Sequence, residues 1–392
     1  MSESPPIPLA VYVHFPWCVS KCPYCDFNSH ALRGQVPESD YLASIGRDLE
    51  QQVRRFAAQL AGREVVSVFL GGGTPSLFSP AAIGEVLGKI GTTLSLAKDV
   101  EVTLEANPGT IERGRFAEYA AAGVNRVSLG AQSFDPQTLQ RLGRIHRADD
   151  TRRAAEELHA AGLARFNLDL MYGLPAQDAA AAERDLAAAI ALAPAQISHY
   201  HLTLEPGTPF AARPPADLPT DETTEGMLEL CQRHLAAAGF ERYEVSAYAR
   251  AGQRCRHNLV YWKFGDYLGL GAGAHGKLSG PEAESGRWQI LRTQHLREPR
   301  RYQRDPSGSL TVQAVPESQR PFEFMLNALR LLAGAQRAEF ESRTGLAWAT
   351  LEPARRRLEQ RGLLQADNAD ALVPTALGLR FLNEMLLEFL PK

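Results

Sequence analysis

Three cysteines lie within eight residues near the start of the chain, in the segment Cys18-Val19-Ser20-Lys21-Cys22-Pro23-Tyr24-Cys25. They follow an apolar run, Leu9 to Phe15, that predicts a buried strand. Because cysteine thiolate is the usual ligand of iron–sulfur clusters, three thiolates on one loop can bind three irons of a 4Fe–4S cluster. The fourth iron then has no protein ligand. The spacing C-x3-C-x2-C therefore predicts a cluster that is open to a small molecule.

Cysteines at this spacing could also bind zinc or form disulfides. A structural zinc site needs four ligands, and here the fourth would be His14 or His30 on a crowded loop. Disulfides fit poorly, because the chain has 5 cysteines in 392 residues and its first ten residues lack the features of an export signal. Cluster binding is the reading that the spacing favours.

The loop, with Tyr24 before its last cysteine, resembles the radical S-adenosylmethionine (SAM) superfamily. The resemblance implies that the open iron chelates the amino and carboxylate groups of SAM. It also implies that one electron from the cluster can break a carbon–sulfur bond to give a 5′-deoxyadenosyl radical.

The bulk composition is that of an ordinary globular protein, with 44% hydrophobic residues and a net charge of -3 from 42 basic and 45 acidic residues. This balance gives no global electrostatic case for nucleic acid binding. No apolar stretch approaches the roughly 20 residues that span a bilayer. Together with the oxygen-sensitive cluster, these features predict a cytoplasmic location.

Strand and helix patterns alternate up to about residue 205. Apolar runs predict strands at Leu9–Phe15, Val65–Leu70, Val100–Glu105, Arg126–Ala131, Arg165–Met171 and Gln196–Leu204. Helical spacing occurs at Asp40–Leu60, Pro80–Ile90, Ile111–Ala122, Asp149–Ala161 and Ala179–Ala191. The long connections between strands imply a parallel sheet. The periodicity fits both a sheet closed into a barrel and an open, doubly wound sheet. The resemblance implies a partial (β/α)6 TIM-like barrel, with its site at the carboxyl ends of the strands.

Residues that could bind a ligand or take part in chemistry lie in or directly after these strands. Gly72, Gly73 and Thr74 come after the second strand, where glycines allow positive φ and close approach of a ligand, or simply a tight turn. Glu105 ends the third strand. Asp169 lies inside the apolar fifth strand, where a carboxylate needs a partner, and a ribose diol would supply one.

These positions resemble a narrower family, that of oxygen-independent coproporphyrinogen III oxidase (HemN), which also contains haem chaperones. The resemblance implies that the glycine-rich segment contacts SAM and that Tyr12 lies near the cluster and SAM. It further implies that SAM's methionyl and ribose parts are contacted by Glu105, Gln132, Arg144 and Asp169. Arg144 can bind a carboxylate in a bidentate manner, although neighbouring arginines could substitute.

Three features favour the haem-chaperone branch. Phe27 stands where the oxidase has a further cysteine, only 17 residues precede Cys18, and the run His257-Asn258-Leu259-Val260-Tyr261-Trp262 matches an H-N-x-x-Y-W motif associated with haem. The resemblance then implies a haem chaperone on a radical SAM enzyme fold, without coproporphyrinogen oxidase activity. The alternative is the oxidase itself, which uses the radical for oxidative decarboxylation of a porphyrinogen.

The motif also makes chemical sense. His257 could be an axial haem ligand, with the flat faces of Tyr261 and Trp262 beside the macrocycle, or it could be a packed core residue. Cys255 is a rival ligand. The glycine-rich run 263–276 predicts a flexible turn that lines the cluster cavity, and His275, His199 and His201 stay unassigned.

The chain is expected to divide into a radical SAM partial barrel (1–240), an extension with the HNLVYW motif and a connection (241–310), and a C-terminal domain (311–392). Residues 279–315 show little periodicity and predict a linker. Beyond them, short helices and a hairpin with its turn at 366–370 suggest a winged-helix-like α+β domain that covers the site or docks a partner. By resemblance the partners are haem and haem-acceptor proteins; a membrane respiratory acceptor and a homodimer are compatible with it.

Overall fold

The computed structural model describes residues 6–110, 115–282, 285–366 and 368–391. Consecutive strands pair in parallel, each joined to the next through helical crossovers. These strands are β1 Leu9–Phe15, β4 Val65–Gly72, β5 Leu96–Ala106, β6 Arg126–Gln132, β7 Phe166–Tyr172 and β8 Gln196–His201. All six correspond to strands predicted from the apolar runs.

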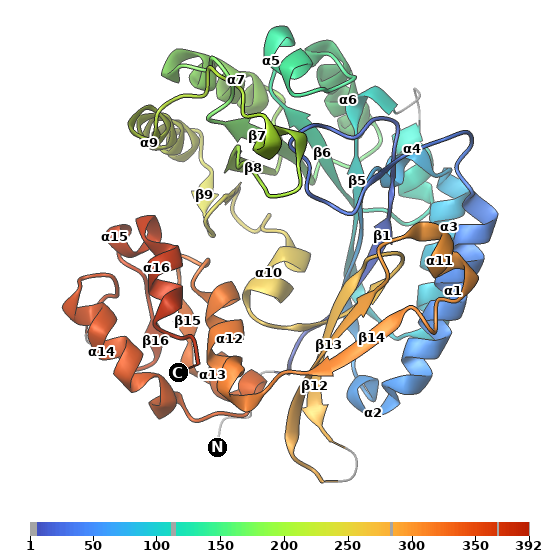
Figure 1. Cartoon of the computed structure of the whole chain (residues 1–392). Coiled ribbons are helices and arrows are strands. Elements are labelled where there is room, and N and C mark those ends of the chain that lie inside the picture. The colour runs from blue at the N-terminus through green and yellow to red at the C-terminus, as the bar shows by residue number, and fades with distance from the viewer. Residues whose placement is uncertain (1–5, 111–114, 283–284, 367, 392) are drawn as a thin grey trace.

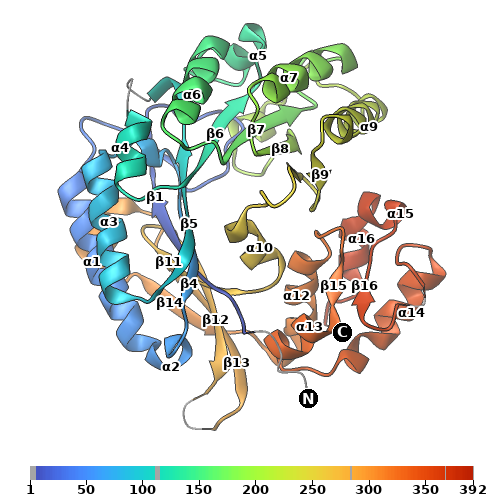
Figure 2. The same cartoon turned by 180° about the vertical axis from the view of Figure 1, so that it is seen from behind.

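Helices cover the outer face of this curved sheet (Figures 1 and 2). The larger ones are α1 Glu38–Arg55, α3 Pro80–Thr93, α4 Arg115–Ala121, α6 Ala148–Ala160, α7 Ala179–Ala191 and α9 Asp221–Ala237, and the short ones are α2 Ala57–Leu60, α5 Pro136–Arg141 and α8 Pro209–Ala212. The first residues of the helix predicted at Ile111–Ala122 lie outside the described residues. N-cap residues fix the first turn of several helices. At the start of α3, the Ser79 hydroxyl accepts a hydrogen bond from the Ala82 N–H at 3.1 Å.

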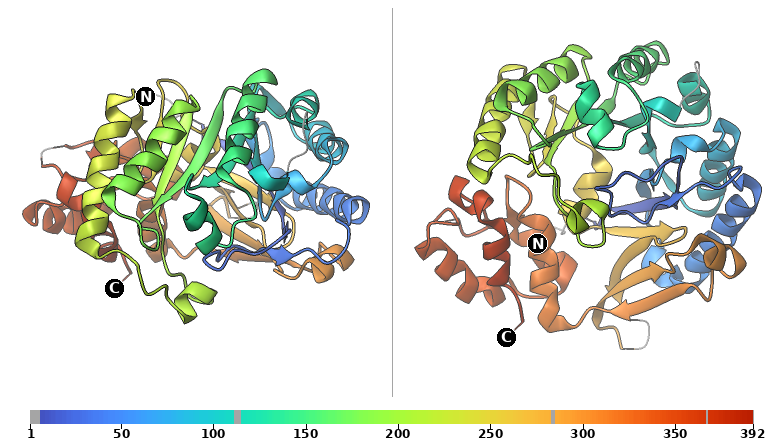
Figure 3. Two further views of the ribbon diagram at one scale, coloured as in Figure 1. Left: turned by 90° about the horizontal axis from the view of Figure 1, so that it is seen from above. Right: turned by 45° about the horizontal axis from the view of Figure 1, so that its top comes forward.

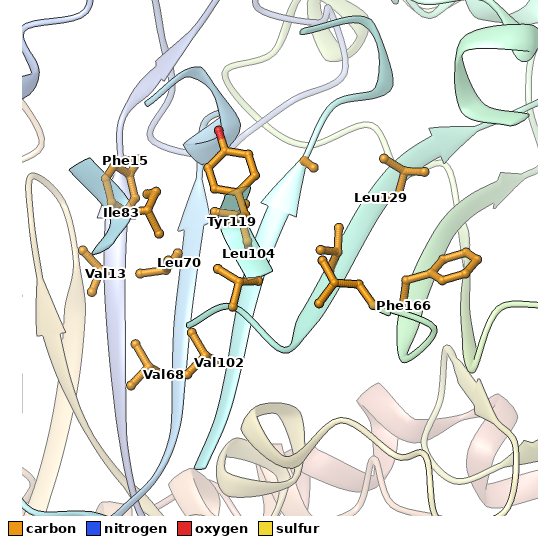
Figure 4. Packing of buried hydrophobic residues seen from close by; sticks show 14 of the residues in the cluster. Val13, Phe15, Val68, Leu70, Ile83, Val102, Leu104, Tyr119, Leu129 and Phe166 are labelled. Carbon is orange, nitrogen blue, oxygen red and sulfur yellow. The ribbon is translucent and has the colours of Figure 1, made fainter. Parts of the chain in front are cut away.

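The main core fills the layer between the sheet and these helices. Figure 4 shows Val13, Leu70, Leu104 and Leu129 of four neighbouring strands gathered with Ile83 of α3. Strands that are buried on both faces read as continuous apolar runs, which is why the sequence revealed them.

The sheet extends beyond the expected barrel strands, since the described residues form one sheet of 12 strands. β11 (Asp266–Leu270) pairs in parallel with β1, and antiparallel strands follow it; the added strands are β12 His275–Pro281, β13 Trp288–His295 and β14 Leu310–Ala314 at one edge and β9 Glu241–Arg242 and β10 Ala247–Ala249 at the other. The expected linker at 279–315 is therefore wrong, and the run 263–276 contains β11 and the start of β12 with only a short turn between them.

A buried ion pair helps to explain that error. Lys277 of β12 is 1% exposed and its Nζ donates to Asp266 Oδ1 of β11 at 2.7 Å. Charged residues in a strand interior make a sequence look like a polar connection, whereas here they are paired with each other inside the fold.

Helix α10 (Arg256–Trp262) lies within the open side of the curved sheet and packs against β4. Figures 1 and 3 show α10, in yellow, between the sheet and the C-terminal region, which is drawn in orange and red. The elements of that region and of the connection before it are α11 Pro299–Arg304, α12 Arg320–Ala328, α13 Arg337–Thr344, α14 Glu352–Gln360, α15 Ala376–Arg380 and α16 Leu382–Leu387. Of the described helices, none is long and apolar enough to cross a membrane.

The C-terminal region has its own core, with Phe324, Phe340 and Leu358 fully buried. Phe264 and Ile290 of the preceding segment belong to the same core. Short strands β15 (Ala335–Gln336) and β16 (Ala371–Leu372) pair antiparallel, which gives the expected α+β character. The predicted turn at 366–370 includes residue 367, outside the described residues.

Candidate functional site

The cysteine loop begins where β1 ends, at the carboxyl edge of the parallel strands. Strand β2 (Trp17–Cys18) opens the loop and pairs with β3 (His30–Ala31), which closes it. Inside, the Cys25 N–H donates to Cys22 O at 3.1 Å, and Lys21 Nζ donates to the carbonyls of Phe27 and Ser29. The loop, in dark blue, crosses over the strand ends in Figure 1.

The glycine segment after β4 is bonded directly to this loop. Gly73 N–H donates to Phe15 O at 2.7 Å, and Thr74 N–H donates to Trp17 O at 2.8 Å. A Cβ on Gly73 would lie 2.6 Å from the Trp17 carbonyl oxygen, so the close approach of the two chains requires glycine. Gly72 has φ +112°, a second reason for glycine here.

A cavity lies under the loop. All three cysteines line it, with most of the predicted SAM contacts: Gly72, Gly73, Thr74, Glu105, Gln132, Arg144 and Asp169. The fold thus brings together residues that are up to 151 positions apart in the chain, from Cys18 to Asp169. Tyr24, Ser29 and Ser128 also line it, and the sequence reasoning did not select them.

Hydrogen-bond donors surround the cysteine sulfurs. Thr74 Oγ1 donates to Cys18 Sγ at 3.4 Å, and Arg144 Nη1 lies 3.8 Å from Cys22 Sγ. Burial raises the pKa of the Cys18 thiol, and the Thr74 hydrogen bond opposes that rise. The donor set suits thiolates that are bound to iron, because donors to sulfur stabilise its negative charge.

Both histidines that could be a fourth zinc ligand are hydrogen-bonded within the chain, and His30 Nε2 lies 3.2 Å from Asn28 Oδ1 and 3.3 Å from Arg297 O. His14 Nε2 is hydrogen-bonded to Asn28 O at 2.9 Å and its Nδ1 to the Tyr12 hydroxyl at 2.9 Å. In the described ranges, no three His, Cys, Asp or Glu side chains converge on one metal ion. A 4Fe–4S cluster does not need its ligands to converge on one ion, because each thiolate binds a different iron.

Arg144 presents an unsatisfied cation to the cavity. Its Nη2 donates to Gly130 O at 2.8 Å, while its buried Nε has no partner in the described structure. No described carboxylate forms an ion pair with it. Its neighbour Arg141 instead pairs with Asp217 at 2.6 Å near the surface. Of these two arginines, Arg144 is the one in the cavity, and it fits a ligand carboxylate.

Two carboxyl groups also line this cavity. Glu105 Oε2 accepts from Gly72 N–H at 2.9 Å; burial raises the Glu105 pKa to about 7, and nearby Asp169 adds to the rise. Asp169 accepts from Ser128 Oγ at 3.0 Å and from Asn167 Nδ2 at 2.8 Å. The carboxylate in the apolar run is therefore partnered within the chain, yet it keeps acceptor capacity for a hydroxyl.

Gln132 is placed by an irregular strand end. It is a non-glycine residue with φ 65°, and the register between β6 and β7 shifts at this point. Such a bulge turns a side chain away from its regular direction. The Tyr200 hydroxyl donates to Gln132 Oε1 at 2.7 Å, which fixes the amide at the cavity wall.

A second cavity adjoins the first. The two share Phe27, Gly72 and Glu105. The rest of its lining comes from β1, α10, β11 and the turns and strands that follow: Tyr12, His14, Asn28, Tyr261, Tyr267, Gly273, His275, Gln294 and Arg297. Tyr12, expected near SAM, therefore lines the second cavity and not the first.

His257 lines neither cavity. It is 2% exposed, its Nδ1 is hydrogen-bonded to Ser67 Oγ at 3.0 Å, and its Nε2 to the Tyr261 hydroxyl at 3.1 Å. Its ring stacks on Phe69 with centroids 4.8 Å apart, and burial lowers its pKa to about 3. The structure thus places His257 as a core residue behind Tyr261.

Cys255, the rival haem ligand, and the unassigned His199 and His201 also lie away from both cavities. Cys255 is 3% exposed and its Sγ donates to Glu101 Oε1 at 3.4 Å. His199 and His201 stack on Tyr172. His275 is the unassigned histidine that reaches the second cavity.

Comparisons with known proteins identify the family. Residues 12–189 match the Radical SAM superfamily, and residues 315–381 match the HemN C-terminal domain. The chain is 47% identical to Heme chaperone HemW of Escherichia coli (strain K12) and 46% identical to Heme chaperone HemW of Haemophilus influenzae, with 98% of each chain covered in both cases. The chain belongs to the HemW family.

Membership of the HemW family, within the radical SAM superfamily, implies a 4Fe–4S cluster and SAM. The chain is also 36% identical to the mitochondrial Radical S-adenosyl methionine domain-containing protein 1 of Bos taurus, over 98% of this chain and 87% of the relative. Coproporphyrinogen III oxidase (HemN) from Escherichia coli shares the fold, with a TM-score of 0.81 at 22% identity, over 99% of this chain and 91% of that one. The predicted fold class is confirmed.

Proposed function

We propose that the protein is a haem chaperone that binds haem and delivers it to haem-requiring proteins, and that it carries a 4Fe–4S cluster and SAM. The observation that carries the proposal is the second cavity, which is walled by Tyr12, Tyr261 and Tyr267 and adjoins the cysteine cavity. Aromatic faces suit a flat, apolar macrocycle. The printed names of the bacterial relatives support the same function.

In this proposal Cys18, Cys22 and Cys25 hold the cluster. The cluster supplies the open iron and the electron of radical SAM chemistry when it is bound. The loop positions the three sulfurs through its own backbone hydrogen bonds and through Thr74, which donates to Cys18.

SAM contacts come from the walls of the same cavity. Arg144, which has unsatisfied donors, binds the ligand carboxylate, and Glu105 faces the positive charges of SAM. Asp169 accepts hydrogen bonds from the ribose hydroxyls, while Gly72, Gly73, Thr74 and Gln132 complete the enclosure. Tyr12 acts from the second cavity, where it holds His14.

Delivery completes the proposed role. The acceptors are haem-requiring proteins, with membrane respiratory proteins among them, and a homodimer is compatible with the proposal. Transfer is measured by mixing the haem-loaded protein with an apo-haem protein, with an equal amount of free haem as the control. Transfer no faster or more complete than from free haem would count against delivery.

The second candidate is the oxygen-independent coproporphyrinogen III oxidase. The fold shared with HemN and the full set of cavity residues favour it. Phe27, at the position of a further cysteine in the oxidase, favours the chaperone.

An anaerobic haem titration, followed at the Soret band with and without the cluster, tests the first proposal. Saturable binding at a fixed stoichiometry is expected, and a non-saturating, linear response would refute it. Incubation with coproporphyrinogen III, SAM and a reductant tests the alternative, since product at enzymatic rates would establish the oxidase.

A further inference from the structure

The second cavity contains a histidine that lies outside the H-N-x-x-Y-W motif. His275 begins β12, and its side chain is exposed. It lines the second cavity and also an adjoining pocket beside Tyr267 and Arg292. Within the described residues its ring makes no hydrogen bond and no ion pair. An open imidazole at the junction of two cavities is available to a ligand.

The other histidines at this cavity are occupied. Both nitrogens of His14 are hydrogen-bonded, as are both nitrogens of His257 behind the wall. Either ring would have to break two buried contacts to bind a metal. His275 would break none, which makes it the better-placed imidazole.

The surroundings of His275 favour the neutral form of its ring. The side chain is exposed on one side, yet its partial burial at the cavity wall lowers the His275 pKa, and Arg292 and Arg297 lower it further. A neutral imidazole with a free nitrogen is the ligand form of histidine. Arg292 is itself paired with Glu323, whereas Arg297 is exposed and has no carboxylate partner in the described part of the chain.

The walls between these groups suit a flat ring. Tyr261 and Tyr267 meet edge to face with centroids 4.4 Å apart, and Phe27 stands at the border with the cysteine cavity. Arg297 Nε has only a long contact, at 3.5 Å, to Asn28 Oδ1. An iron porphyrin with acidic side chains matches an open imidazole, aromatic walls and an unpaired guanidinium.

We propose that His275 is the protein ligand of the haem iron in the second cavity, and that Arg297 binds a haem propionate. The inference rests on the proposed haem-binding function. His257 is then a positioning residue, since it holds the Tyr261 hydroxyl from behind the cavity wall.

The test compares His275→Ala with His234→Ala, a partly exposed histidine of α9 that contacts Glu183. Haem titrations give the affinity, and electron paramagnetic resonance with resonance Raman spectroscopy reports an imidazole on the iron. We expect His275→Ala to lose the imidazole signature and to weaken binding by at least about tenfold. Added imidazole should restore the signature, and His234→Ala should behave like the parent. Circular dichroism and iron content confirm that each variant is folded and loaded.

The outcomes separate this inference from the proposed function. Saturable binding by the parent with an unchanged spectrum in His275→Ala would overturn the ligand assignment and leave haem binding intact. Loss of the signature in His257→Ala but not in His275→Ala would also overturn it. Absence of binding by the parent would refute the proposed function itself.

The propionate contact has its own probe. Arg297→Gln should weaken binding of haem but not of haem dimethyl ester, whose propionates are uncharged, and it should leave the imidazole signature unchanged. Equal weakening for haem and for the ester would overturn the role of Arg297.

Discussion

The two adjoining cavities are built in different ways from different parts of the chain. The cysteine cavity is formed by the carboxyl ends of consecutive parallel strands, and it holds groups with unused bonding capacity, such as Arg144 and Glu105. The second cavity is formed largely by β1, α10 and the later strands, and its walls include the aromatic rings of Phe27 and of three tyrosines. The first is preorganised for a small, charged ligand, and the second suits a larger, flatter one.

Their shared border makes the comparison testable. Phe27, Gly72 and Glu105 line both cavities, so a ligand in one can influence the other. Variants that act on one cavity alone should separate cluster and SAM binding from haem binding.

The largest effect is expected from the cysteines. Cys22→Ala should lose nearly all bound iron and acid-labile sulfide after anaerobic reconstitution, because one cluster iron loses its thiolate ligand. It should also abolish the change in the electron resonance spectrum on adding SAM. Cys231→Ala is the control, since Cys231 is buried in the main core and lines neither cavity. A full iron complement in Cys22→Ala would contradict the cluster assignment.

The cysteine cavity could be anticipated from the sequence because its information is local. Most of the contributing residues lie in or directly after an apolar strand, and the ends of parallel strands meet at one edge of the sheet. Glu105 and Asp169 could therefore be chosen from their positions in single strands. Arg144 could be chosen over its neighbours only by resemblance, because the sequence does not show that Arg141 turns outward to Asp217.

The second cavity could not be anticipated in the same way. His275 and Arg297 flank strands β12 and β13, in a stretch that was expected to be a turn and a linker. The direction of His257 depends on Ser67 and Phe69, which lie almost two hundred residues earlier in the chain. Such contacts are tertiary, and no short pattern in the sequence records them.

The next largest effect concerns SAM. Arg144→Met should weaken SAM binding by about 2 kcal/mol or more, roughly 30-fold in affinity, because truncating one partner of a buried charge pair leaves the other unpaired. Calorimetry on the cluster-loaded protein measures this change. Arg141→Met, which removes the surface pair with Asp217, should bind SAM like the parent.

Decarboxylated SAM, which lacks the ligand carboxylate, provides a second test of the role of Arg144. If Arg144 binds the ligand carboxylate, the variant and the parent should bind this analogue with similar affinity. An equal loss for SAM and for the analogue would show that Arg144 acts through the shape of the cavity and not through the carboxylate. Iron content is measured in parallel, because Arg144 also contacts Cys22.

The smallest effect is a pH dependence at the border between the cavities. The Glu105 pKa is raised to about 7 in the folded, ligand-free protein, by burial and then by Asp169. Because the positive charges of SAM favour ionised Glu105, SAM affinity should fall about tenfold from pH 8 to pH 6. The amino group of SAM titrates too, so the comparison is with Glu105→Gln, in which the Glu105 contribution should vanish. An equal pH dependence in both proteins would exclude Glu105 from SAM binding.

Stability without SAM should change in the opposite sense. A carboxyl group whose pKa is higher in the folded than in the unfolded state stabilises the fold most at a pH below its unfolded value of 4.5. That contribution is lost as the pH rises through about 7, so urea unfolding should show the parent losing stability relative to Glu105→Gln between pH 5 and pH 8. The pKa values of His14 and His257 are lowered to about 4 and about 3, so both histidines add stability as the pH rises toward their unfolded value of 6.5; the comparison with Glu105→Gln cancels that contribution. The ionised Glu105 thus weakens the fold at the pH at which SAM binds best. Bound SAM then supplies the positive charge partner that the carboxylate lacks in the ligand-free protein. Glu105 lines both cavities, so SAM bound on one side would also fix the charge at the edge of the other.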